Sequence, residues 1–292
     1  MGGIMSALNV LLTKVSDDTV SGSSEIYSEL LRELTKLVSQ KPSSREWQEF
    51  ATGLTKVKRS MAPIQNVAGS LKVLLNASIP EEQLNGFIKG FLTDLVEREG
   101  QAAGTIARTV TREHRPKKIV TISYSSTVMA AILALPKEVE VSVAESLPLG
   151  EGAVTYRRLL EKGVKVSLFR DSMIAPEVAA ADLVLVGADA ISPEGVVNKV
   201  GTRLLAMAAK DQGVDMVALC STSKLIPVLD MDPMASVRNS EGLRYSESIF
   251  EITPLSLFHS VITEEGVLSG VEMEKRLLRD RSKMKENDCH DC

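Results

Sequence analysis

Apolar residues follow two different patterns along this chain of 292 residues. Up to about residue 112 they recur three and four positions apart, which is the spacing of one face of an α-helix. The stripes are Ile26, Leu30, Leu31, Leu34 and Leu37; Ile64, Val67, Ala68, Leu71, Leu74 and Leu75; and Leu84, Phe87, Ile88, Phe91, Leu92, Leu95 and Val96. Ser43 with Glu46, and Pro80 with Glu81, are typical of helix starts. Residues 1–112 are therefore predicted to form a helical N-terminal domain.

After residue 112, short apolar runs alternate with helical segments. The predicted strands are 118–122, 140–144, 165–168, 183–186, 216–219 and 260–263, and the predicted helices between them are 126–135, 153–161 and 203–212. Continuous apolar strands separated by helices are typical of a parallel sheet that is covered on both faces. The sequence thus predicts an α/β domain over residues 113–292, with a charged helix over 271–285 near its end.

The strand predicted at 183–186 is followed by Asp189, and then by Asn198 and Lys199 before Gly201-Thr202 opens the next helix. In an open parallel sheet, ligands bind beyond the carboxyl ends of the strands, where helix N-termini also point. A loop that supplies a carboxylate, an amide and a cation at this edge predicts a site for a small phosphorylated ligand. Asp189 alone leaves three roles open: a general acid, a hydroxyl acceptor or the cap of a turn.

Other polar residues are predicted to reach the same edge of the sheet. They are Ser123, Ser125, Ser126 and Thr127 after the first strand, Glu145 after the second and Lys224 after the fifth. Hydroxyls and amides that open a helix suit a phosphate, but they also suit an ordinary N-cap. Arg59 precedes a helix of the N-terminal domain, where its guanidinium is either a phosphate ligand or a solvated surface charge.

Composition narrows the class of function. A formal net charge of −4 provides no global basic field for nucleic acid or an anionic membrane. No apolar run is long enough to span a bilayer, no secretion leader is recognised and only three cysteines occur, so a cytoplasmic protein is expected. The chain has no P-loop, G-x-G-x-x-G, H-E-x-x-H or nucleophile elbow, and neither a cofactor nor a metal is predicted.

Two short motifs lie near the ends of the sequence. Cys289 and Cys292 form a C-x-x-C pair, which is a metal clip or redox pair in some proteins and is interpreted here as a frayed tail. The segment Met1–Ser6 fits a short myristoylation pattern that is easily met by chance. Cys220 lies in an apolar run and is expected to be a small buried hydrophobe.

Together these segments resemble one superfamily, which contains the alpha, beta and delta regulatory subunits of translation initiation factor 2B, ribose-1,5-bisphosphate isomerase and methylthioribose-1-phosphate isomerase. The resemblance extends over nearly the whole chain. It rests on Arg59–Pro63 with Asn66, Thr121–Thr127, Glu145-Ser146, Gly187-Ala188-Asp189, Asn198–Thr202, Lys224 and Phe250–Pro254. It implies an N-terminal helical domain, a Rossmann-like C-terminal domain, and a homodimer or larger homo-oligomer formed through the C-terminal domain.

The resemblance also implies roles, and three positions depart from them. In the isomerases a cysteine and the Gly-Ala-Asp aspartate move protons between C1 and C2; these positions are Ser123 and Asp189 here. Two phosphate-gripping arginines of the isomerases correspond to Ser21 and Leu147. A serine hydroxyl is a poor acid or base near neutral pH, and no adjacent base is evident in the sequence. The sequence therefore favours a protein similar to the regulatory subunits, which binds a sugar phosphate or nucleotide without turnover.

In this hypothesis Asp189 accepts a hydroxyl from the ligand, and cations neutralise its phosphate. The expected ligand-binding residues are Arg59, Ser125, Ser126, Thr127, Glu145, Asn198, Lys199 and Lys224. Two alternatives stay open: an aldose-ketose isomerase acting on ribose 1,5-bisphosphate or a relative, which Asp189 favours, and a structural assembly subunit with a vestigial cleft. A translation initiation factor is a further candidate partner, whereas nucleic acid and membrane are not expected.

Overall fold

The structure of the protein is a computed structural model that describes residues 6–18, 22–229, 236–240 and 243–288. The chain divides into two compact units, residues 1–101 and 102–292. Residues 1–5 of the short myristoylation pattern, Ser21 and the pair Cys289–Cys292 lie outside the described residues. No helix in the described part of the chain is long and apolar enough to cross a membrane.

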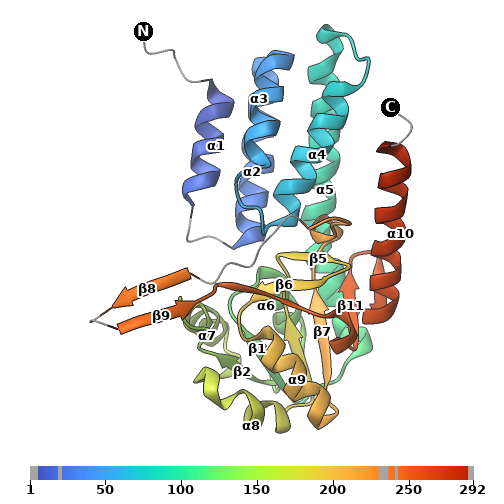
Figure 1. The fold of residues 1–292 in the computed structure, drawn as a ribbon. Coiled ribbons are helices and arrows are strands. Elements are labelled where there is room, and N and C mark those ends of the chain that lie inside the picture. Colours follow the sequence, from blue (N-terminus) through green and yellow to red (C-terminus); the bar gives the residue numbers. More distant parts are fainter. Residues whose placement is uncertain (1–5, 19–21, 230–235, 241–242, 289–292) are drawn as a thin grey trace. The chain divides into compact units, whose positions relative to one another are not determined.

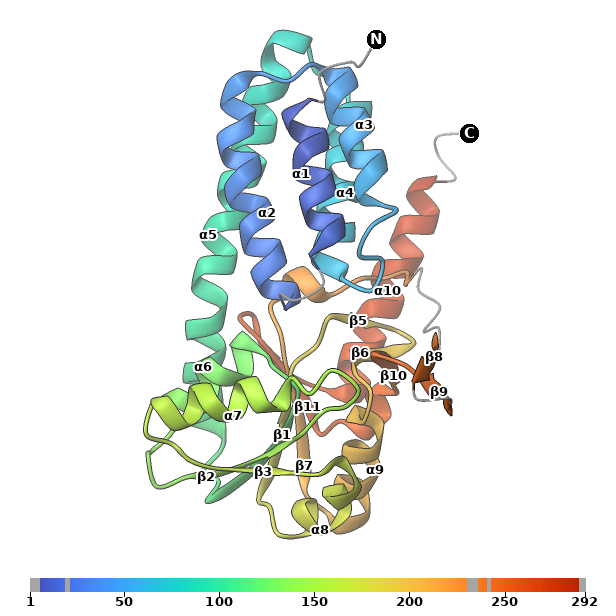
Figure 2. The same ribbon diagram turned by 90° about the vertical axis from the view of Figure 1, so that its left-hand side faces the viewer.

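The first unit consists of helices, as the stripes predict. Its elements are α1 (Ala7–Asp17), α2 (Ser23–Leu37), the 3-10 helix η1 (Val38–Gln40), α3 (Ser44–Leu54), α4 (Ala62–Asn76) and the larger part of α5 (Glu81–Glu113). The helices lie side by side in both ribbon views (Figures 1 and 2). Trp47 and Phe50 of α3 are fully buried in their common core. The capping box is confirmed: the Ser43 N–H donates to Glu46 Oε2 at 2.9 Å, and the Glu46 N–H donates to Ser43 Oγ at 3.3 Å.

Helix α5 is shared between the two units. Its first turns bury Leu84 and Ile88 in the helical core, whereas its last turns bury Ile106 and Val110 in an apolar cluster with residues of the sheet. The division therefore falls inside one continuous helix, because different stretches of it are covered by different cores. The expected domain boundary after residue 112 stays a prediction.

The second unit is built around a seven-stranded sheet with the strand order β12-β11-β7-β4-β1-β2-β3. The strands are β1 (Lys118–Ile122), β2 (Glu140–Ala144), β3 (Lys165–Phe169), β4 (Leu183–Val186), β7 (Asp215–Leu219), β11 (Ser260–Thr263) and β12 (Gly266–Ser269). All six predicted strands are present and parallel, and the α/β fold class is confirmed. Strand β12 was not predicted, and it pairs antiparallel with β11 because a two-residue turn cannot make a parallel crossover.

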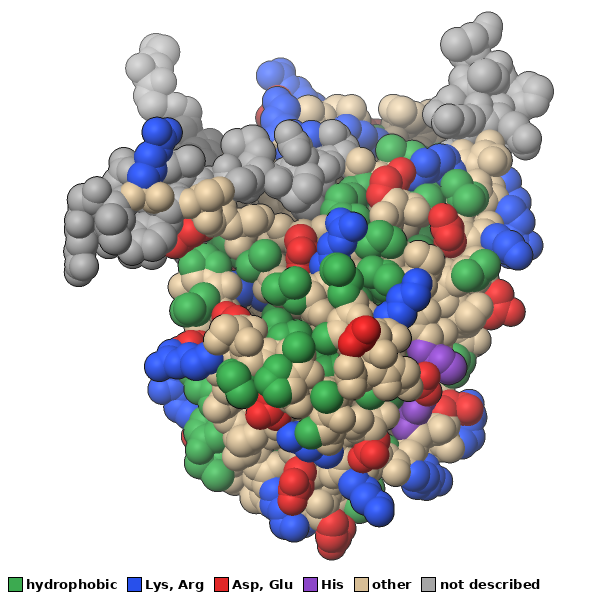
Figure 3. Space-filling view, turned by 60° about the horizontal axis from the view of Figure 1, so that its bottom comes forward, with side chains coloured by type: hydrophobic (Ala, Val, Ile, Leu, Met, Phe, Trp, Pro, Cys, Tyr) green, Lys and Arg blue, Asp and Glu red, His purple; other side chains and the backbone are tan. Residues whose placement is uncertain are grey.

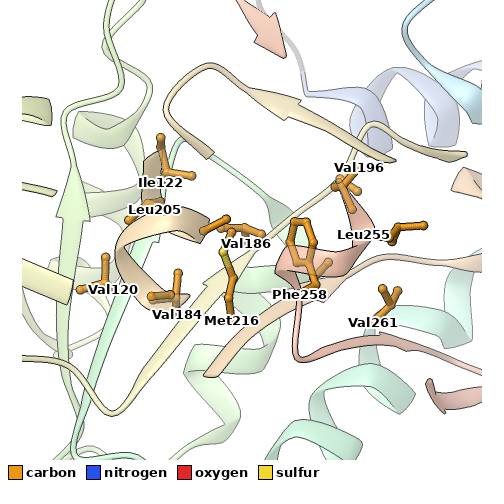
Figure 4. Packing of buried hydrophobic residues seen from close by; sticks show 14 of the residues in the cluster. Val120, Ile122, Val184, Val186, Val196, Leu205, Met216, Leu255, Phe258 and Val261 are labelled. Atoms are coloured by element: carbon orange, nitrogen blue, oxygen red, sulfur yellow. The ribbon is translucent and has the colours of Figure 1, made fainter. Parts of the chain in front are cut away.

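Helices and apolar clusters cover both faces of this sheet, as predicted. The helices are α6 (Ser126–Ala134), α7 (Gly152–Glu161), α8 (Ile174–Ala179), α9 (Thr202–Gln212) and α10 (Gly270–Asp288). Alternate residues of β4 point to opposite clusters: Val184 and Val186 pack with Leu205 of α9, as Figure 4 shows, whereas Leu183 and Leu185 belong to the cluster of the other face. This alternation explains why the central strands are apolar along their whole length.

Five strands outside the main sheet were missed by the apolar pattern. Strands β5 (Ala190–Ser192), β6 (Gly195–Lys199) and β10 (Phe250–Thr253) form an antiparallel sheet, and β8 (Ser236–Ser240) pairs with β9 (Leu243–Glu247). Three further 3-10 helices follow strands or strand-like segments: η2 (Asp171–Met173), η3 (Thr222–Lys224) and η4 (Leu255–Leu257). The β5–β6 hairpin carries the segment that was predicted to be a binding loop.

Candidate functional site

The candidate site lies at the carboxyl ends of β1 and β4, the two strands between which the order of the sheet reverses. Ligand crevices of open α/β sheets occur at such a point. The turns after these strands approach each other so closely that a Cβ on Gly187 would lie 2.6 Å from Ser125 Oγ. The glycine of the Gly-Ala-Asp motif is therefore required for the close contact of the two turns.

The turn after β1 is held in an unusual backbone conformation by side chains. Ser123 has a φ of 61°, in the left-handed region that few non-glycine residues adopt. Its N–H donates to Ser146 Oγ at 2.7 Å, and its carbonyl accepts the hydroxyl of Thr155 at 2.6 Å. Asp171 in turn accepts the N–H groups of Ser146 and Leu147, each at 2.8 Å. The Ser123 amide is thus committed to Ser146.

The predicted phosphate cradle after β1 is divided between two roles. Ser125 is the N-cap of α6, and its hydroxyl accepts the Val128 N–H at 3.4 Å. Ser126 and Thr127 occupy the first positions of the helix, where an α-helix leaves the N–H groups without intrahelical partners. These amides are the part of the cradle that an anion can use.

Asp189 begins the β5–β6 hairpin, and its N–H donates to the carbonyl of Val197 at 2.8 Å. Asn198 and Lys199 lie on β6 and pair with β10, so the expectation that they lie in a loop was wrong. The reason is a tight turn between Ser192 and Gly195, which turns the apolar residues on either side into paired strands. The hairpin places Asp189 near the end of β4 and Lys199 at the far end of β6.

The segment between β6 and α9 is closed by the chain's own groups. The Asn198 amide donates to Thr202 Oγ1 at 3.0 Å, and that hydroxyl donates to the Lys199 carbonyl at 2.6 Å. Glu251 Oε1 accepts the N–H groups of Gly201 and Arg203 at 2.7 and 2.8 Å. The N-terminus of α9, which the sequence suggested as part of the phosphate site, is therefore occupied by a carboxylate of β10.

Two lysines of the site are almost completely buried. The Lys199 side chain is 2 % exposed, and its ammonium lies 2.8 Å and 3.1 Å from the two carboxylate oxygens of Glu151. Lys224 is 3 % exposed, and its ammonium donates to the carbonyl of Ala188 at 2.6 Å. A buried charge is costly unless it is paired or hydrogen-bonded. Lys199 has a full counter-charge, whereas the partner of Lys224 is a neutral carbonyl next to Asp189.

Two further residues predicted to bind the ligand are Glu145 and Arg59. The Glu145 carboxylate pairs with the exposed guanidinium of Arg170, and this hydrogen bond and the negative charge raise the pKa of Arg170. Arg59 is exposed in the turn before α4, in the first unit. No group of three or more His, Cys, Asp or Glu side chains that could hold a metal occurs among the residues that the structure describes.

Sequence reasoning missed the residues that organise the site. Glu151, Thr155, Asp171 and Glu251 hold the turns through contacts between residues that are 25 to 50 positions apart. Such contacts leave no local pattern in the sequence. Ser146 did stand beside Glu145 in the motif that carried the resemblance, but its contact with the Ser123 amide has no sequence signal.

Comparison with known proteins decides the family. The model of the initiation factor 2 subunit family matches residues 4–270. The chain belongs to the initiation factor 2 subunit family. A translation initiation factor eIF-2B subunit 2-like protein of Pyrococcus horikoshii is 30% identical over 227 residues, which are 75% of this chain and 80% of that protein. Ribose 1,5-bisphosphate isomerase of Haloferax volcanii is 32% identical over 169 residues, and the match covers 51% of each chain.

Solved structures of this family share the fold. The translation initiation factor eIF-2B of Pyrococcus horikoshii has a TM-score of 0.77 at 24% identity, covering 91% of this chain and 98% of that chain. A chain of the tetrameric eIF2B-beta2-delta2 complex of C. thermophilum has a TM-score of 0.75 at 22% identity, covering 90% and 92%. The resemblance drawn from the motifs is therefore confirmed. The chain spans about half the length of the ribose 1,5-bisphosphate isomerases that it matches, and the family includes both initiation-factor and isomerase names.

Proposed function

We propose that this protein binds a sugar phosphate or a nucleotide at the carboxyl end of β1 and β4 without converting it. The observation that supports the proposal most strongly is the Lys224 ammonium, which is buried against the Ala188 carbonyl of the Gly-Ala-Asp turn. No carboxylate within 4 Å pairs with Lys224 among the described residues. An anion beside it would gain a charge-assisted hydrogen bond and place a full negative charge next to the ammonium.

The proposal assigns a role to each of the other candidate residues. Asp189 adjoins the carbonyl that Lys224 contacts, and its carboxylate is suited to accept a ligand hydroxyl. The first amides of α6, from Ser126 and Thr127, offer donors to phosphate oxygens. Lys199 would add positive charge, while the Asn198 amide stabilises the turn after β6 and Glu145 pairs with Arg170. Arg59 stays a predicted phosphate ligand from the sequence.

The absence of turnover is proposed from the chemistry of Ser123. Its alcohol stands at the position that the isomerases fill with a thiol, and its hydroxyl would need a strong base to take part in proton transfer. The contacts of the Ser123 backbone with Ser146 and Thr155 fix the turn without supplying such a base.

The second candidate function is an aldose-ketose sugar-phosphate isomerase. Asp189 and the similarity to ribose 1,5-bisphosphate isomerases favour it. A sensitive assay for conversion of ribose 1,5-bisphosphate, with Asp189→Asn as the control, decides between the two. Turnover that is lost in both Asp189→Asn and Ser123→Ala would replace the non-catalytic proposal with this one.

The proposal also covers the location, the assembly and the partners of the protein. We expect a cytoplasmic protein that forms a homodimer or larger homo-oligomer, with a translation initiation factor as a candidate partner, in line with its family. If the protein is instead a structural subunit with a vestigial cleft, we still expect a cytoplasmic homo-oligomer, but no ligand binding.

Thermal unfolding tests the binding proposal, because a ligand that binds the folded state raises the midpoint of unfolding. We expect at least one compound in a series of sugar phosphates and nucleotides to stabilise the wild type, and Lys224→Met to lose most of that shift. Lys210→Met provides a matched control, since Lys210 is exposed near the end of α9. A series in which no compound stabilises the wild type would contradict ligand binding.

A further inference from the structure

We infer that Glu151 is an internal counter-anion of Lys199, which a phosphate group must displace in order to bind there. This inference rests on the proposed function and adds a regulation of the same site. Glu151 is the N-cap residue of α7, and Lys199 ends β6, so two elements 48 residues apart in the chain meet in this pair. Neither the motifs nor the family resemblance singled out Glu151.

The pair is held by charge more than by well-formed hydrogen bonds. Glu151 Oε1 accepts a hydrogen bond from the lysine at 3.1 Å. Glu151 Oε2 is closer, at 2.8 Å, but it is buried and lies outside hydrogen-bonding geometry with any donor that the structure describes. Only one of the two carboxylate oxygens therefore has good hydrogen-bond geometry with the ammonium. The ion pair is therefore one that a better anion can replace.

The two partners differ in what they lose on separation. Lys199 is 2 % exposed and needs an anion wherever Glu151 goes, whereas the Glu151 side chain is 27 % exposed and already reaches solvent. A carboxylate at a helix N-terminus is also favoured by the backbone dipoles, and Glu151 keeps this position at the start of α7 when it turns outward. A phosphate can thus take its place with little loss for Glu151.

Lys199 and Lys224 differ in whether a carboxylate already neutralises their charge, and this difference suggests what the displacement of Glu151 is for. Lys224 offers its charge without any carboxylate partner among the described residues, while the charge of Lys199 is cancelled by Glu151 in the unliganded site. A weakly charged or neutral molecule can approach Lys224 but cannot displace Glu151. Glu151 therefore selects for ligands whose anionic group is strong enough to replace a carboxylate on Lys199.

Isothermal titration with ribose 5-phosphate, and with D-ribose as the uncharged probe, tests this role. We expect Glu151→Gln to bind ribose 5-phosphate about tenfold more tightly than wild type, because Lys199 then lacks a competing anion. D-ribose binding should be the same in both proteins. Glu161→Gln is the matched control on the exposed end of α7 and should resemble the wild type. Glu151→Asp, which keeps the charge on a shorter side chain, should give a smaller gain and serves if Glu151→Gln does not fold.

The outcomes separate this inference from the function on which it rests. Equal or weaker binding of ribose 5-phosphate by Glu151→Gln, while the wild type binds it, would overturn the role of Glu151 and leave the binding site in place. A gain that persists in the double variant Glu151→Gln with Lys199→Met would overturn it too, since the gain must act through Lys199. If neither the wild type nor any variant binds, both this inference and ligand binding at the site are wrong for this probe class.

Discussion

The two ends of the main sheet use charged and polar residues in opposite ways. Lys224, which follows the carboxyl end of β7, and Lys199, which ends β6, are both buried, and the ammonium of each donates to an oxygen atom of the chain. At the amino ends of β7 and β11, His259 Nδ1 lies 3.0 Å from Asp215 Oδ1, and both side chains are about half exposed. Asp215 and His259 thus keep contact with water, whereas the contacts of Lys199 and Lys224 replace it.

This difference changes what each contact is worth. Ion pairs in solvent contribute little to stability, because water and salt screen them and the side chains lose freedom. Buried polar groups are costly when a partner is removed, since nothing replaces it. The face in Figure 3 also shows acidic and basic side chains interspersed, with the two described histidines close together. Specific chemistry is therefore expected at the carboxyl end, and ordinary surface behaviour at the amino end.

The largest effect is expected from a glycine at the carboxyl end. A Cβ on Gly152 would overlap the carbonyl oxygen of Ala144, which belongs to the backbone of β2 and cannot move without disturbing the sheet. Gly152→Ala should lower the free energy of unfolding by at least about 3 kcal/mol in urea denaturation. Gly163 precedes β3 at the amino end, with a φ of +76° and open space around it, so Gly163→Ala should cost only about 1 kcal/mol. Equal losses would mean that the two ends are packed alike.

An intermediate effect is expected from a buried hydroxyl. Ser146 accepts the Ser123 N–H and donates to the Ala144 carbonyl, so Ser146→Ala leaves a backbone donor unpaired and should cost about 2 kcal/mol. Ser260, at the amino end of β11, has a buried hydroxyl with no partner in the described part of the chain. Ser260→Ala should change stability by less than about 0.5 kcal/mol, or raise it. A large loss in Ser260→Ala would contradict the contrast between the two ends.

The comparison also explains which features the sequence could predict. The core helices bury one face and leave a periodic apolar stripe, whereas strands such as β4 (Leu183–Val186) are buried on both faces and leave a continuous apolar run. Strands β5 and β6 carry no comparable alternation, and the polar residues Asn198 and Lys199 at the end of β6 suggest a loop. Pairing with β10, from a segment about 50 residues later, makes them a strand.

The sequence predicted at which edge of the sheet the candidate residues lie, but it did not predict the contacts between them. Asp189, Lys224 and the serines after β1 follow strands, and the rule that ligands bind at carboxyl ends places them at one edge. Two contacts illustrate what was missed. Glu151 pairs with Lys199, and Glu251 accepts the amides of Gly201 and Arg203. These contacts depend on how distant turns meet in space, so spacing along the chain does not encode them.

The smallest effect is expected from the histidines of the amino end, as a dependence of stability on pH. Burial lowers the pKa of His114 from its usual value of 6.5, the negative charge of Asp215 opposes this, and the nearby His259 lowers it further. The pKa of the folded state is thus below that of the unfolded state, so the unfolded state binds more protons and stability falls as the pH decreases through the region of 6.5 and below. His114→Gln should reduce this loss, measured by urea unfolding between pH 7.5 and pH 5.

Asp215 supplies the decisive control for that prediction. Its charge raises the pKa of His114, so Asp215→Asn should lower that pKa further and steepen the loss of stability in acid. At neutral pH the same variant should cost less than about 1 kcal/mol, because the contact with His259 that it removes is half exposed. In the double variant with His114→Gln, the steeper acid response should disappear. If Asp215→Asn instead flattens the response, the negative charge of Asp215 does not raise the pKa of His114, and this prediction is wrong.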